Sequence, residues 1–534
     1  MHRPLTTIDL ADNTGAALTS DVCIVGSGPA GGFLAASLAA NGHDVMLLEA
    51  GNDSPDMSES ELVASMDITG AKSEAFGFSR QVGGSSNLWA GRTAPLEAID
   101  FEHRDWVPDS GWPVTRAELD DYYDQAARII SLPDEDHDPR DGLLALSDEL
   151  CDGPLETKSF LWSAPPFKIA DYLRAQADSF TGGLTLVQNA RVRSLHELPS
   201  GRAVDAVEAL TPSGQTVRIG AHVVVLAAGG LETPRILLNS TAVRPSGIGN
   251  DHDAVGRYFS THPKADMAML VLNRRVPVTS AMFTDVDVGG GRLRYGLGLG
   301  AAAQREHRCL NHYVQLSPFL EYRANRLFER IKNEKALSSS LIDSSAVVRG
   351  MLPGLGLMAF EAIGRVARLQ RRARMFVLRG FLDQYPDRGN RVRLSGQQDR
   401  FGRRMIDVHW RFTERDRQSV LDFLSVLDRE MRARNVGHLE FGGLRDKADW
   451  PITGIHSHFM GTTRMGESDR NAVVDRDCKV FGYDNLFVSG PSTFSAYGYA
   501  NPFLTIAALA LRLADHLDQR MHAHAPTVAL TAEA

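Results

Sequence analysis

The stretch from Asp21 to Gly51, DVCIVGSGPAGGFLAASLAANGHDVMLLEAG, constrains the fold more than any other part of this chain. Its four-residue apolar run, Val22 to Val25, is too short for a helix and is typical of a buried parallel strand. The glycines that follow, Gly26, Gly28 and Gly31, have the spacing GxGxxG. The first permits a tight turn, the second lets a pyrophosphate approach the backbone, and the third lets the next helix pack closely. The pattern predicts a dinucleotide-binding turn.

Two further elements support this prediction. Residues 30 to 41 are small and rich in alanine, which predicts a helix whose N-terminal amides can face an anion. A second apolar strand, Val45 to Leu48, ends in Glu49, an acid placed to accept hydrogen bonds from the ribose hydroxyls of an adenosine. This acid favours FAD or NAD over NADP. A glycine-rich turn without a ligand is the alternative, but strand, turn, helix and acid in this order favour the dinucleotide.

Length and charge narrow the class of protein. The chain has 534 residues, more than one hydrophobic core usually supports, so two domains are expected. Its net charge of −9 argues against a nucleic-acid partner. The same charge weakly favours a cationic substrate, although solubility is the simpler explanation.

Cysteine usage and the absence of long apolar runs point to the cytoplasm. Four cysteines lie far apart without a CxxC pair, so we expect neither a disulfide framework nor a metal site: they are Cys23, Cys151, Cys309 and Cys478. The first twenty residues lack the apolar core of an export signal. No run of 18 apolar residues exists that would predict a membrane span.

A glycine-serine cluster follows the first domain's opening unit. The segment from Val82 to Gly91, VGGSSNLWAG, suits a backbone that lies against a flat ligand, although a surface turn would have the same composition. Farther along, Thr115 and Glu118 have the spacing of a capping box, which predicts that a helix starts near Arg116.

Strand patterns change in character along the middle of the chain. Residues 184 to 226 predict the strands TLVQNARVRSL, AVDAVEAL, TVRI and HVVVLAAGG, and the last leads through a tight turn into the helix LETPRILLNS. From about Lys264, longer alternating segments predict an antiparallel sheet made of MAMLVLN, LRYGLGL, NHYVQLS, RVRLS and MIDVHWR. Thr413 and Asp416 predict the capped start of a long helix, SVLDFLSVLDREMRAR.

A helical excursion at about 322 to 376 interrupts these strands. Apolar residues recur at helical spacing between Leu355 and Leu369, while Arg365, Arg368, Arg371 and Arg372 fall largely elsewhere. We expect an amphipathic helix packed on the sheet. The alternative is an interfacial helix, residues 351 to 376, that makes a weak contact with a membrane or a protein partner.

The C-terminal part returns to the pattern of the first domain. It contains HSHFMGTTRMG from His456 to Gly466, the short glycine-ended strand NLFVSG, and Asn501-Pro502 ahead of the helix FLTIAALALRLADHL. A nucleotide-binding start, an antiparallel middle and this return predict two domains built from a discontinuous chain.

Taken together, these motifs resemble the glucose-methanol-choline (GMC) family of FAD-dependent oxidoreductases almost from end to end. The resemblance is carried by GSGPAG with EAG, VGGSSNLWAG, AAGGLETPRIL, VGRYFSTHP, HFMGTTRMG, NLFVSG and YANPFLT. SGWPVTRAELDDYY and GTTRMG are most similar to the bacterial, pyranose-oxidase-like branch.

The resemblance implies an α/β fold, α+β overall, in two domains. A Rossmann-type FAD-binding domain would comprise residues 15–110, 180–263 and 455–525. A substrate-binding domain would comprise residues 111–179 and 264–454, built on a six-stranded antiparallel sheet flanked by helices.

The resemblance also implies which residues form the site. The family's proton acceptor, the histidine of H-x-x-G-T, falls on His458, and its partner before the last helix falls on Asn501. A base for the hydroxyl proton is also what the chemistry needs, and histidine titrates nearest neutrality. His456, two residues away, would point to the other face of an extended backbone and is expected to be structural. The residues expected to bind the cofactor are Gly26, Gly28, Gly31, Glu49, Gly83, Gly84, Ser85, Asn87, Leu88, Trp89, Ala90, Val192, Ala228, Gly229, Gly490, Asn501, Pro502 and Phe503.

The expected activity is oxidation of an alcohol to a carbonyl. His458 would accept the hydroxyl proton, Asn501 would bind the developing alkoxide, and hydride would pass to flavin N5. The expected substrate is a sugar, glycoside, aminoglycoside or related polyol, and the electron acceptor is oxygen, a quinone or another carrier. Leu88 stands where relatives with a tethered flavin have histidine, so FAD is expected to be non-covalent. Phe503 adds bulk near the flavin, where the family often has threonine.

Two alternatives to a free oxidase or dehydrogenase remain. A hydroxynitrile lyase of the same fold would keep FAD without net oxidation. A dehydrogenase docked to a membrane or protein acceptor would use the helix at residues 351–376.

Overall fold

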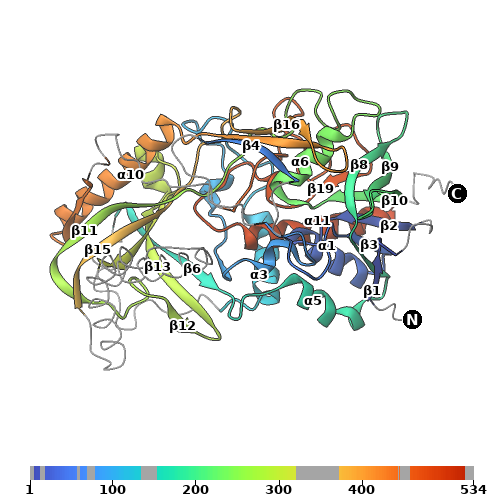
Figure 1. The fold of residues 1–534 in the computed structure, drawn as a ribbon. Helices are drawn as coiled ribbons and strands as arrows, with labels where there is room; N and C mark the ends of the chain where they lie inside the picture. The colour runs from blue at the N-terminus through green and yellow to red at the C-terminus, as the bar shows by residue number, and fades with distance from the viewer. Residues whose placement is uncertain are drawn as a thin grey trace, which may run out of the picture.

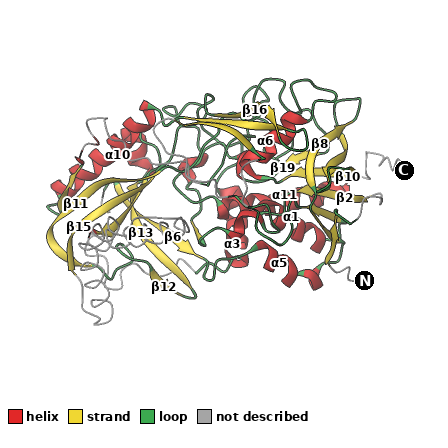
Figure 2. Cartoon of the chain, in the orientation of Figure 1, coloured by secondary structure: helices red, strands yellow, loops and turns green. Residues whose placement is uncertain are grey.

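The computed structural model describes residues 5–12, 18–56, 61–68, 78–133, 153–319, 372–442, 444 and 457–523. Two lobes lie side by side in Figure 1, each built on one large sheet. Figure 2 shows helices clustered around the sheet of one lobe and long, curved strands dominating the other. The mixed α/β fold class is therefore confirmed.

The first sheet has eight strands in the order β1-β7-β3-β2-β10-β9-β8, with β19 paired to β10. The pairs from β1 to β10 and the β10–β19 pair are parallel, while β9 and β8 are antiparallel. Its strands come from the beginning, middle and end of the chain, as expected of a discontinuous domain. Their bounds are β1 Leu5–Asp9, β2 Leu18–Val25, β3 Val45–Leu48, β7 Leu184–Gln188, β8 Arg191–Glu197, β9 Val204–Leu210, β10 Thr216–Leu226 and β19 Leu486–Val488.

The central strands of this sheet are apolar because helices cover them. Both Val45–Leu48 and the last four residues of β10 are completely buried, as parallel strands usually are. The two strands predicted as TVRI and HVVVLAAGG are one continuous strand, β10. Helices α1 Pro29–Ala40, α6 Gly229–Asn239 and α11 Phe503–Ala523 pack against the sheet, while α5 Ile169–Ala175 packs on α1 and α3 Asp120–Ile129 packs on α11.

The second sheet also has eight strands, in the order β18-β11-β15-β14-β13-β6-β5, with β12 paired to β13. All its pairs are antiparallel, as predicted. Six strands are of substantial length, and the short β5 and β12 raise the expected number from six to eight. The bounds are β5 Arg92–Thr93, β6 Leu155–Trp162, β11 Lys264–Pro277, β12 Val286–Val288, β13 Gly291–Leu299, β14 Tyr313–Pro318, β15 Arg372–Phe381 and β18 Gly437–Glu440.

Capping chemistry sets the start of two helices, as predicted. Helix α10, Glu414–Ala433, begins after Thr413, which exchanges reciprocal hydrogen bonds with Asp416. Thr115 and Glu118 make the same exchange ahead of α3, through a short 3-10 turn. The remaining helical turns are α2 Ala98–Phe101, α7 Ala301–His307, η1 Gly84–Asn87, η2 Ala117–Leu119, η3 Ala177–Ser179 and η5 Pro491–Thr493.

Two expectations for the middle of the chain were wrong. RVRLS and MIDVHWR, now β16 Arg391–Gln398 and β17 Arg404–Trp410, do not join the large antiparallel sheet. They form a three-stranded sheet with β4, Val63–Ile68, and β17 runs parallel to β4. The expected excursion at about 322 to 376 was also wrong at its end, because residues 372–376 belong to β15; residues 320–371 lie outside the described residues. Among the residues described, no helix combines the length and the apolar character needed to cross a bilayer.

Candidate active site

The dinucleotide-type turn between β2 and α1 has the geometry that its glycines predict. A Cβ on Gly31 would lie 1.9 Å from the carbonyl oxygen of Gly26, so helix and turn could not pack so closely with any other residue. A Cβ on Gly28 would meet nothing within 4 Å. Open space therefore lies beside Gly28, where the pyrophosphate of a dinucleotide would approach the backbone.

Glu49 connects this turn to the glycine-serine loop. Its carboxylate accepts hydrogen bonds from the Ser27 hydroxyl at 2.5 Å and from the Gly51 amide at 3.0 Å. Burial raises the pKa of Glu49, and these hydrogen bonds oppose the rise. The Gly83 amide donates to the Ser27 hydroxyl at 3.1 Å, which docks the loop on the turn. Asn87 holds the loop itself, because its side-chain amide donates to the carbonyls of Val82 and Gly84.

An open cavity lies against this turn, and it is lined by the glycines of the turn and by Glu49. The predicted cofactor residues that line it are Gly26, Gly28, Glu49, Gly84, Ser85, Val192, Ala228 and Gly229. The other predicted cofactor residues, which do not line it, are Gly31, Gly83, Asn87, Leu88, Trp89, Ala90, Gly490, Asn501, Pro502 and Phe503. The residues present fit FAD: an open backbone turn for the pyrophosphate and a buried acid for the ribose.

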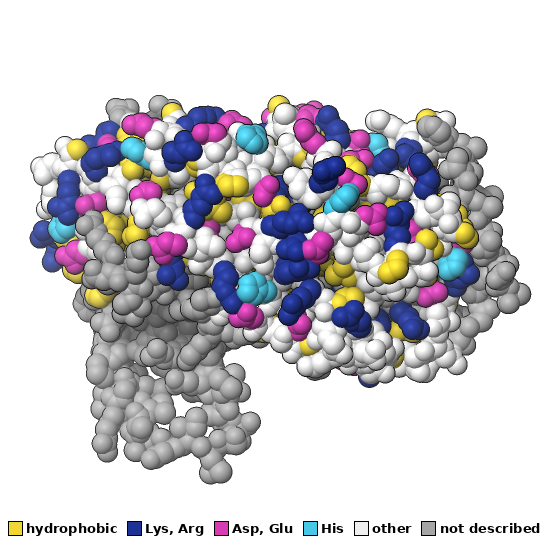
Figure 3. Space-filling model, turned by 90° about the horizontal axis from the view of Figure 1, so that it is seen from above, with side chains coloured by type: hydrophobic (Ala, Val, Ile, Leu, Met, Phe, Trp, Pro, Cys, Tyr) yellow, Lys and Arg dark blue, Asp and Glu magenta, His cyan; other side chains and the backbone are white. Residues whose placement is uncertain are grey.

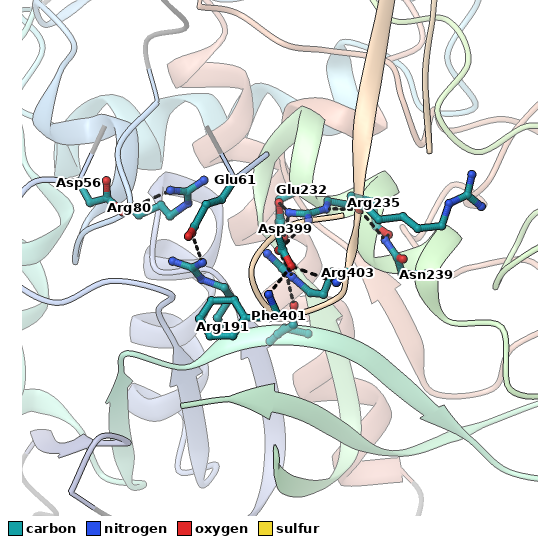
Figure 4. A network of polar contacts seen from close by, with 12 residues as sticks. Asp56, Glu61, Arg80, Arg191, Glu232, Arg235, Asn239, Asp399, Phe401 and Arg403 are labelled. Carbon is teal, nitrogen blue, oxygen red and sulfur yellow. Dashed lines mark hydrogen bonds and ion pairs between the residues drawn. The ribbon is translucent and has the colours of Figure 1, made fainter. Parts of the chain in front are cut away.

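Sequence reasoning missed a charged wall of this cavity, which includes Arg80, Arg191, Glu232 and Arg403. Figure 4 shows how these side chains converge from different elements. Arg403 donates to Glu232 at 2.8 Å and to Asp399 at 2.9 Å, and Arg235 donates to Asp399 at 2.9 Å. The only signal in the sequence was LETPR, since Glu232 and Arg235 lie in that quoted motif.

This network holds the β16–β17 hairpin against α6. Asp399 and Arg235 are completely buried, so each charge requires its partner. Burial raises the pKa of Glu232, but the positive charges of Arg235 and Arg403 outweigh burial and lower it to about 2. Glu232 is therefore ionised at every physiological pH.

The predicted base, His458, lies against a second histidine that sequence reasoning did not assign. The Nδ1 atoms of His458 and His262 are 3.1 Å apart, and the two rings meet edge to face. His262 is completely buried, and its Nε2 lies 3.1 Å from the carbonyl oxygen of Tyr497. In the sequence, His262 was quoted only as part of the motif VGRYFSTHP and was not named as a candidate site residue.

These contacts determine the tautomer of His458. A carbonyl oxygen only accepts, so Nε2 of His262 carries a proton and donates it to Tyr497. Burial lowers the pKa of His262 to about 4, so the ring is neutral at physiological pH and its Nδ1 is an acceptor. Nδ1 of His458 must then donate to His262, and Nε2 of His458 is the nitrogen that can take up a proton. His456 lies outside the described residues.

Asn501, the predicted partner of His458, is held by hydrogen bonds to Arg92 and Thr93, the two residues of β5. Its side-chain Nδ2 donates to the carbonyl of Arg92 at 3.0 Å, and its own carbonyl accepts from the Thr93 hydroxyl at 3.1 Å. This leaves Nδ2 with a second hydrogen. The Oδ1 atom is buried and has no hydrogen-bond partner among the described residues. Both atoms could therefore bind a ligand.

The aromatic residues predicted near the flavin stack on each other. The rings of Trp89 and Phe503 lie 3.8 Å apart and nearly parallel, and Trp89 donates to the carbonyl of Phe167. Phe503 also meets Phe33 edge to face. Leu88, beside this cluster in sequence, is 40% exposed.

Other reactive side chains contribute little. Cys23, Cys309 and Cys478 are buried and unpaired, and burial raises the pKa of each thiol to about 12, so none is poised as a nucleophile. His43, Asp518 and His522 bring potential metal-ligating atoms within 4.8 Å of one another. His43 is already hydrogen-bonded to Asp518 at 2.6 Å.

Comparison with known proteins agrees with this geometry. Residues 21–312, just over half of the chain, match the family described as FAD dependent oxidoreductase, and residues 386–510 match that described as GMC oxidoreductase. A 2-methyl-1,2-propanediol dehydrogenase from Mycolicibacterium austroafricanum is 24% identical, over 94% of this chain and 95% of that protein. A paromamine 6'-oxidase from Streptomyces fradiae is also 24% identical, over 92% of this chain and 90% of that protein.

Solved structures share the fold. Pyridoxine 4-oxidase from Mesorbium loti superposes with a TM-score of 0.54 at 19% identity, covering 95% of this chain and 100% of that chain. The dinucleotide turn, the cavity and the two family matches lead to one assignment. The chain belongs to the FAD-dependent oxidoreductases, and within them to the GMC oxidoreductase family.

Proposed function

We propose that this protein oxidises an alcohol group of a small molecule to a carbonyl. The observation that carries the proposal is the contact between His458 and the buried His262, because it makes Nε2 of His458 a proton acceptor. Oxidation of an alcohol requires such an acceptor for the hydroxyl proton. When bound, FAD supplies the acceptor for the hydride of the alcohol carbon.

In this mechanism two residues act on the substrate oxygen. His458 takes the hydroxyl proton at Nε2 while Nδ1 stays hydrogen-bonded to His262. Asn501 donates its second amide hydrogen to the oxygen as negative charge develops there. The backbone carbonyl of Arg92 and the hydroxyl of Thr93 hold Asn501 in place, so this donor needs no rearrangement during the reaction.

The names of the relatives support the proposed substrate class. One relative is named for a diol and another for the 6' position of paromamine. We therefore take a sugar, glycoside, aminoglycoside or related polyol as the substrate. Because one relative is a dehydrogenase and the other an oxidase, the electron acceptor is oxygen, a quinone or another carrier.

An anaerobic screen of alcohols and sugars tests this proposal. A substrate should bleach the visible absorbance of the bound flavin without oxygen, because electrons then remain on the cofactor. Re-admitting oxygen, and separately a quinone, identifies the acceptor by the return of the colour. Turnover of a hydroxynitrile with no bleaching by any alcohol would indicate the lyase alternative instead.

We also propose that FAD is bound without a covalent link. Leu88 occupies the position where a histidine would be needed, and a hydrocarbon side chain cannot bond to the flavin methyl group. Acid precipitation should leave a yellow supernatant and a colourless pellet. A yellow pellet would contradict the proposal.

A further inference from the structure

Two cations on the antiparallel sheet, Arg92 and Lys264, lie near residues that contact the candidate catalytic groups. Arg92 is in β5, at one edge of the antiparallel sheet, and Lys264 begins β11 in the same sheet. Both approach one aromatic ring: the Arg92 guanidinium lies 4.2 Å and the Lys264 ammonium 5.0 Å from the centre of Phe381. The Arg92 guanidinium also lies 3.9 Å from the centre of the Phe160 ring.

Each cation is linked to one of the two candidate catalytic residues. Asn501 is hydrogen-bonded to the backbone carbonyl of Arg92. Lys264 is two residues from His262, whose ring contacts His458, and the charge of Lys264 helps to lower the pKa of His262. Arg92 is therefore tied to Asn501 through its backbone, and Lys264 lies near the pair formed by His262 and His458.

Neither cation is neutralised by a described residue. Nε and Nη2 of Arg92 are buried without a hydrogen-bond partner, and Lys264 makes no ion pair within the described ranges. Asp285 acts on Arg92 only through space, because it is paired with Arg294 at 3.5 Å. A third cation, Arg379, differs from these two because it lies opposite the acidic Asp266 in the register of β11 and β15.

Two other polar groups close to Arg92 are also unsatisfied. The hydroxyl of Tyr313 and Oδ1 of Asn501 are buried without a hydrogen-bond partner among the described residues. Buried polar groups are normally hydrogen-bonded, so several unsatisfied ones in one place indicate where a polar ligand binds. Burial and the charges of Arg92 and Arg379 lower the pKa of Lys264 to about 7, a strain that a bound anion would relieve.

Unlike Arg92 and Lys264, exposed charged side chains of this protein lie beside side chains of opposite charge. In Figure 3, Lys and Arg side chains gather over the middle of the face but lie beside acidic ones. Exposed arginines are commonly paired, as Arg308 is with Asp105 at 3.0 Å and Arg174 with Asp53 at 2.7 Å. Arg92 and Lys264 thus differ from these exposed arginines, because neither forms an ion pair with a described residue.

We propose that the substrate carries a carboxylate, as a hydroxy acid or an acidic sugar does, and that Arg92 and Lys264 bind it while its alcohol faces His458 and Asn501. The proposal rests on the alcohol oxidation proposed above and narrows its substrate class. A guanidinium and an ammonium are natural partners of a carboxylate in a site of low dielectric. They would repel an aminoglycoside, so that member of the substrate class is disfavoured although the net charge of −9 would attract it.

Matched ligands that differ only in charge test this inference. The holoenzyme is reduced anaerobically with glycerate against glycerol, and with glucuronate against glucose and glucosamine. We expect the acid of each set to reduce the flavin with a kcat/KM at least about tenfold higher than its neutral or cationic counterpart. Equal rates within each set would overturn the inference, whereas failure of every alcohol to bleach the flavin would overturn the proposed function itself.

Variants of Lys264 give a second, independent readout. Lys264→Gln should raise KM at least about tenfold more for the acid than for its neutral counterpart, and Lys264→Arg should restore much of the difference. Lys264→Glu should reverse the preference towards glucosamine. The exposed Lys168 offers the matched control, and Lys168→Gln should leave the preference unchanged. If Lys264→Gln binds FAD and keeps the wild-type preference for acids, the inference fails.

Discussion

A single contact between two imidazoles determines how His458 can act. Because His262 is buried, neutral and donates its only proton to a carbonyl, it can only accept from His458. His458 is thereby held in the tautomer whose Nε2 takes up a proton. A lone histidine in solution would populate both tautomers, and the productive one would be present only part of the time.

Replacing His458 tests the assigned base. In His458→Ala, flavin reduction should slow by at least about a hundredfold, because general bases typically contribute about 10² to 10⁴ in rate. The FAD content should stay the same, and the residual rate should rise with pH as solvent base substitutes. Stopped-flow reduction of wild type, His458→Ala and His456→Ala decides the matter. A normal rate in the first variant with a collapsed rate in the second would falsify the assignment.

Replacing His262 tests its role as a positioning residue. His262→Phe keeps a ring in the buried site but removes the acceptor for Nδ1 of His458. We expect flavin reduction to slow about tenfold or more, and the pH at which the rate reaches half its maximum to move, because the tautomer of His458 is no longer held. The exposed His103 gives the control, as His103→Phe should change neither. An unchanged pH profile in His262→Phe would show that the contact is only structural.

Among the elements, the β16–β17 hairpin depends most on charge. Its turn residues Asp399 and Arg403 reach Glu232 and Arg235 on α6, and Arg403 also donates to the carbonyl of Val192 on β8. These bonds tie three elements together along the wall of the cofactor cavity. Stability of this wall should therefore depend on the ionisation of Glu232.

The expected pH dependence follows from the lowered pKa of Glu232. Its ordinary value is 4.5 and its folded value about 2, so its stabilising contribution is complete above about pH 4.5 and is lost as the pH falls towards 2. Glu232→Gln should lower stability by about 1 to 3 kcal/mol near neutrality, because Arg403 loses a charged partner.

Thermal unfolding from pH 7 down to pH 4 measures this effect. The difference in Tm between wild type and Glu232→Gln should be largest at pH 6 to 7 and shrink below pH 4.5. Exposed Glu306 provides the control, and Glu306→Gln should unfold like wild type throughout. A difference that stays constant with pH would disprove the proposed role of the ionised carboxylate.

On the scale of the whole molecule, the cofactor cavity joins distant parts of the chain. Its wall includes the β2–α1 turn, Val192 from β8, residues 227–232, and Phe459 and Pro491 from the C-terminal return. A ligand in this cavity therefore contacts segments that are far apart in the sequence. Binding a ligand to the folded state alone raises stability by mass action.

Removing FAD should destabilise the entire protein. At a free FAD concentration of about 100 times Kd, binding contributes about 2.7 kcal/mol. The Tm of the apoprotein should therefore be lower by several degrees and should rise again with added FAD, whereas NADP should have little effect because Glu49 disfavours a 2'-phosphate. Differential scanning fluorimetry with each ligand makes the comparison. An apoprotein with the same Tm as the holoprotein would contradict the prediction that ligand binding in this cavity stabilises the folded protein.

Local windows of sequence were enough to predict the dinucleotide turn, both capping boxes and most strands, because backbone preferences and periodicity act over a few residues. Ordered motifs were enough to indicate the family. Tertiary structure alone brought His262 to His458, 196 residues away, and Arg235 to Asp399, 164 residues away. It also placed β16 and β17 in a separate sheet and brought Arg92 and Lys264 to the same ring of Phe381. Such contacts depend on how distant segments pack, and no local preference encodes them.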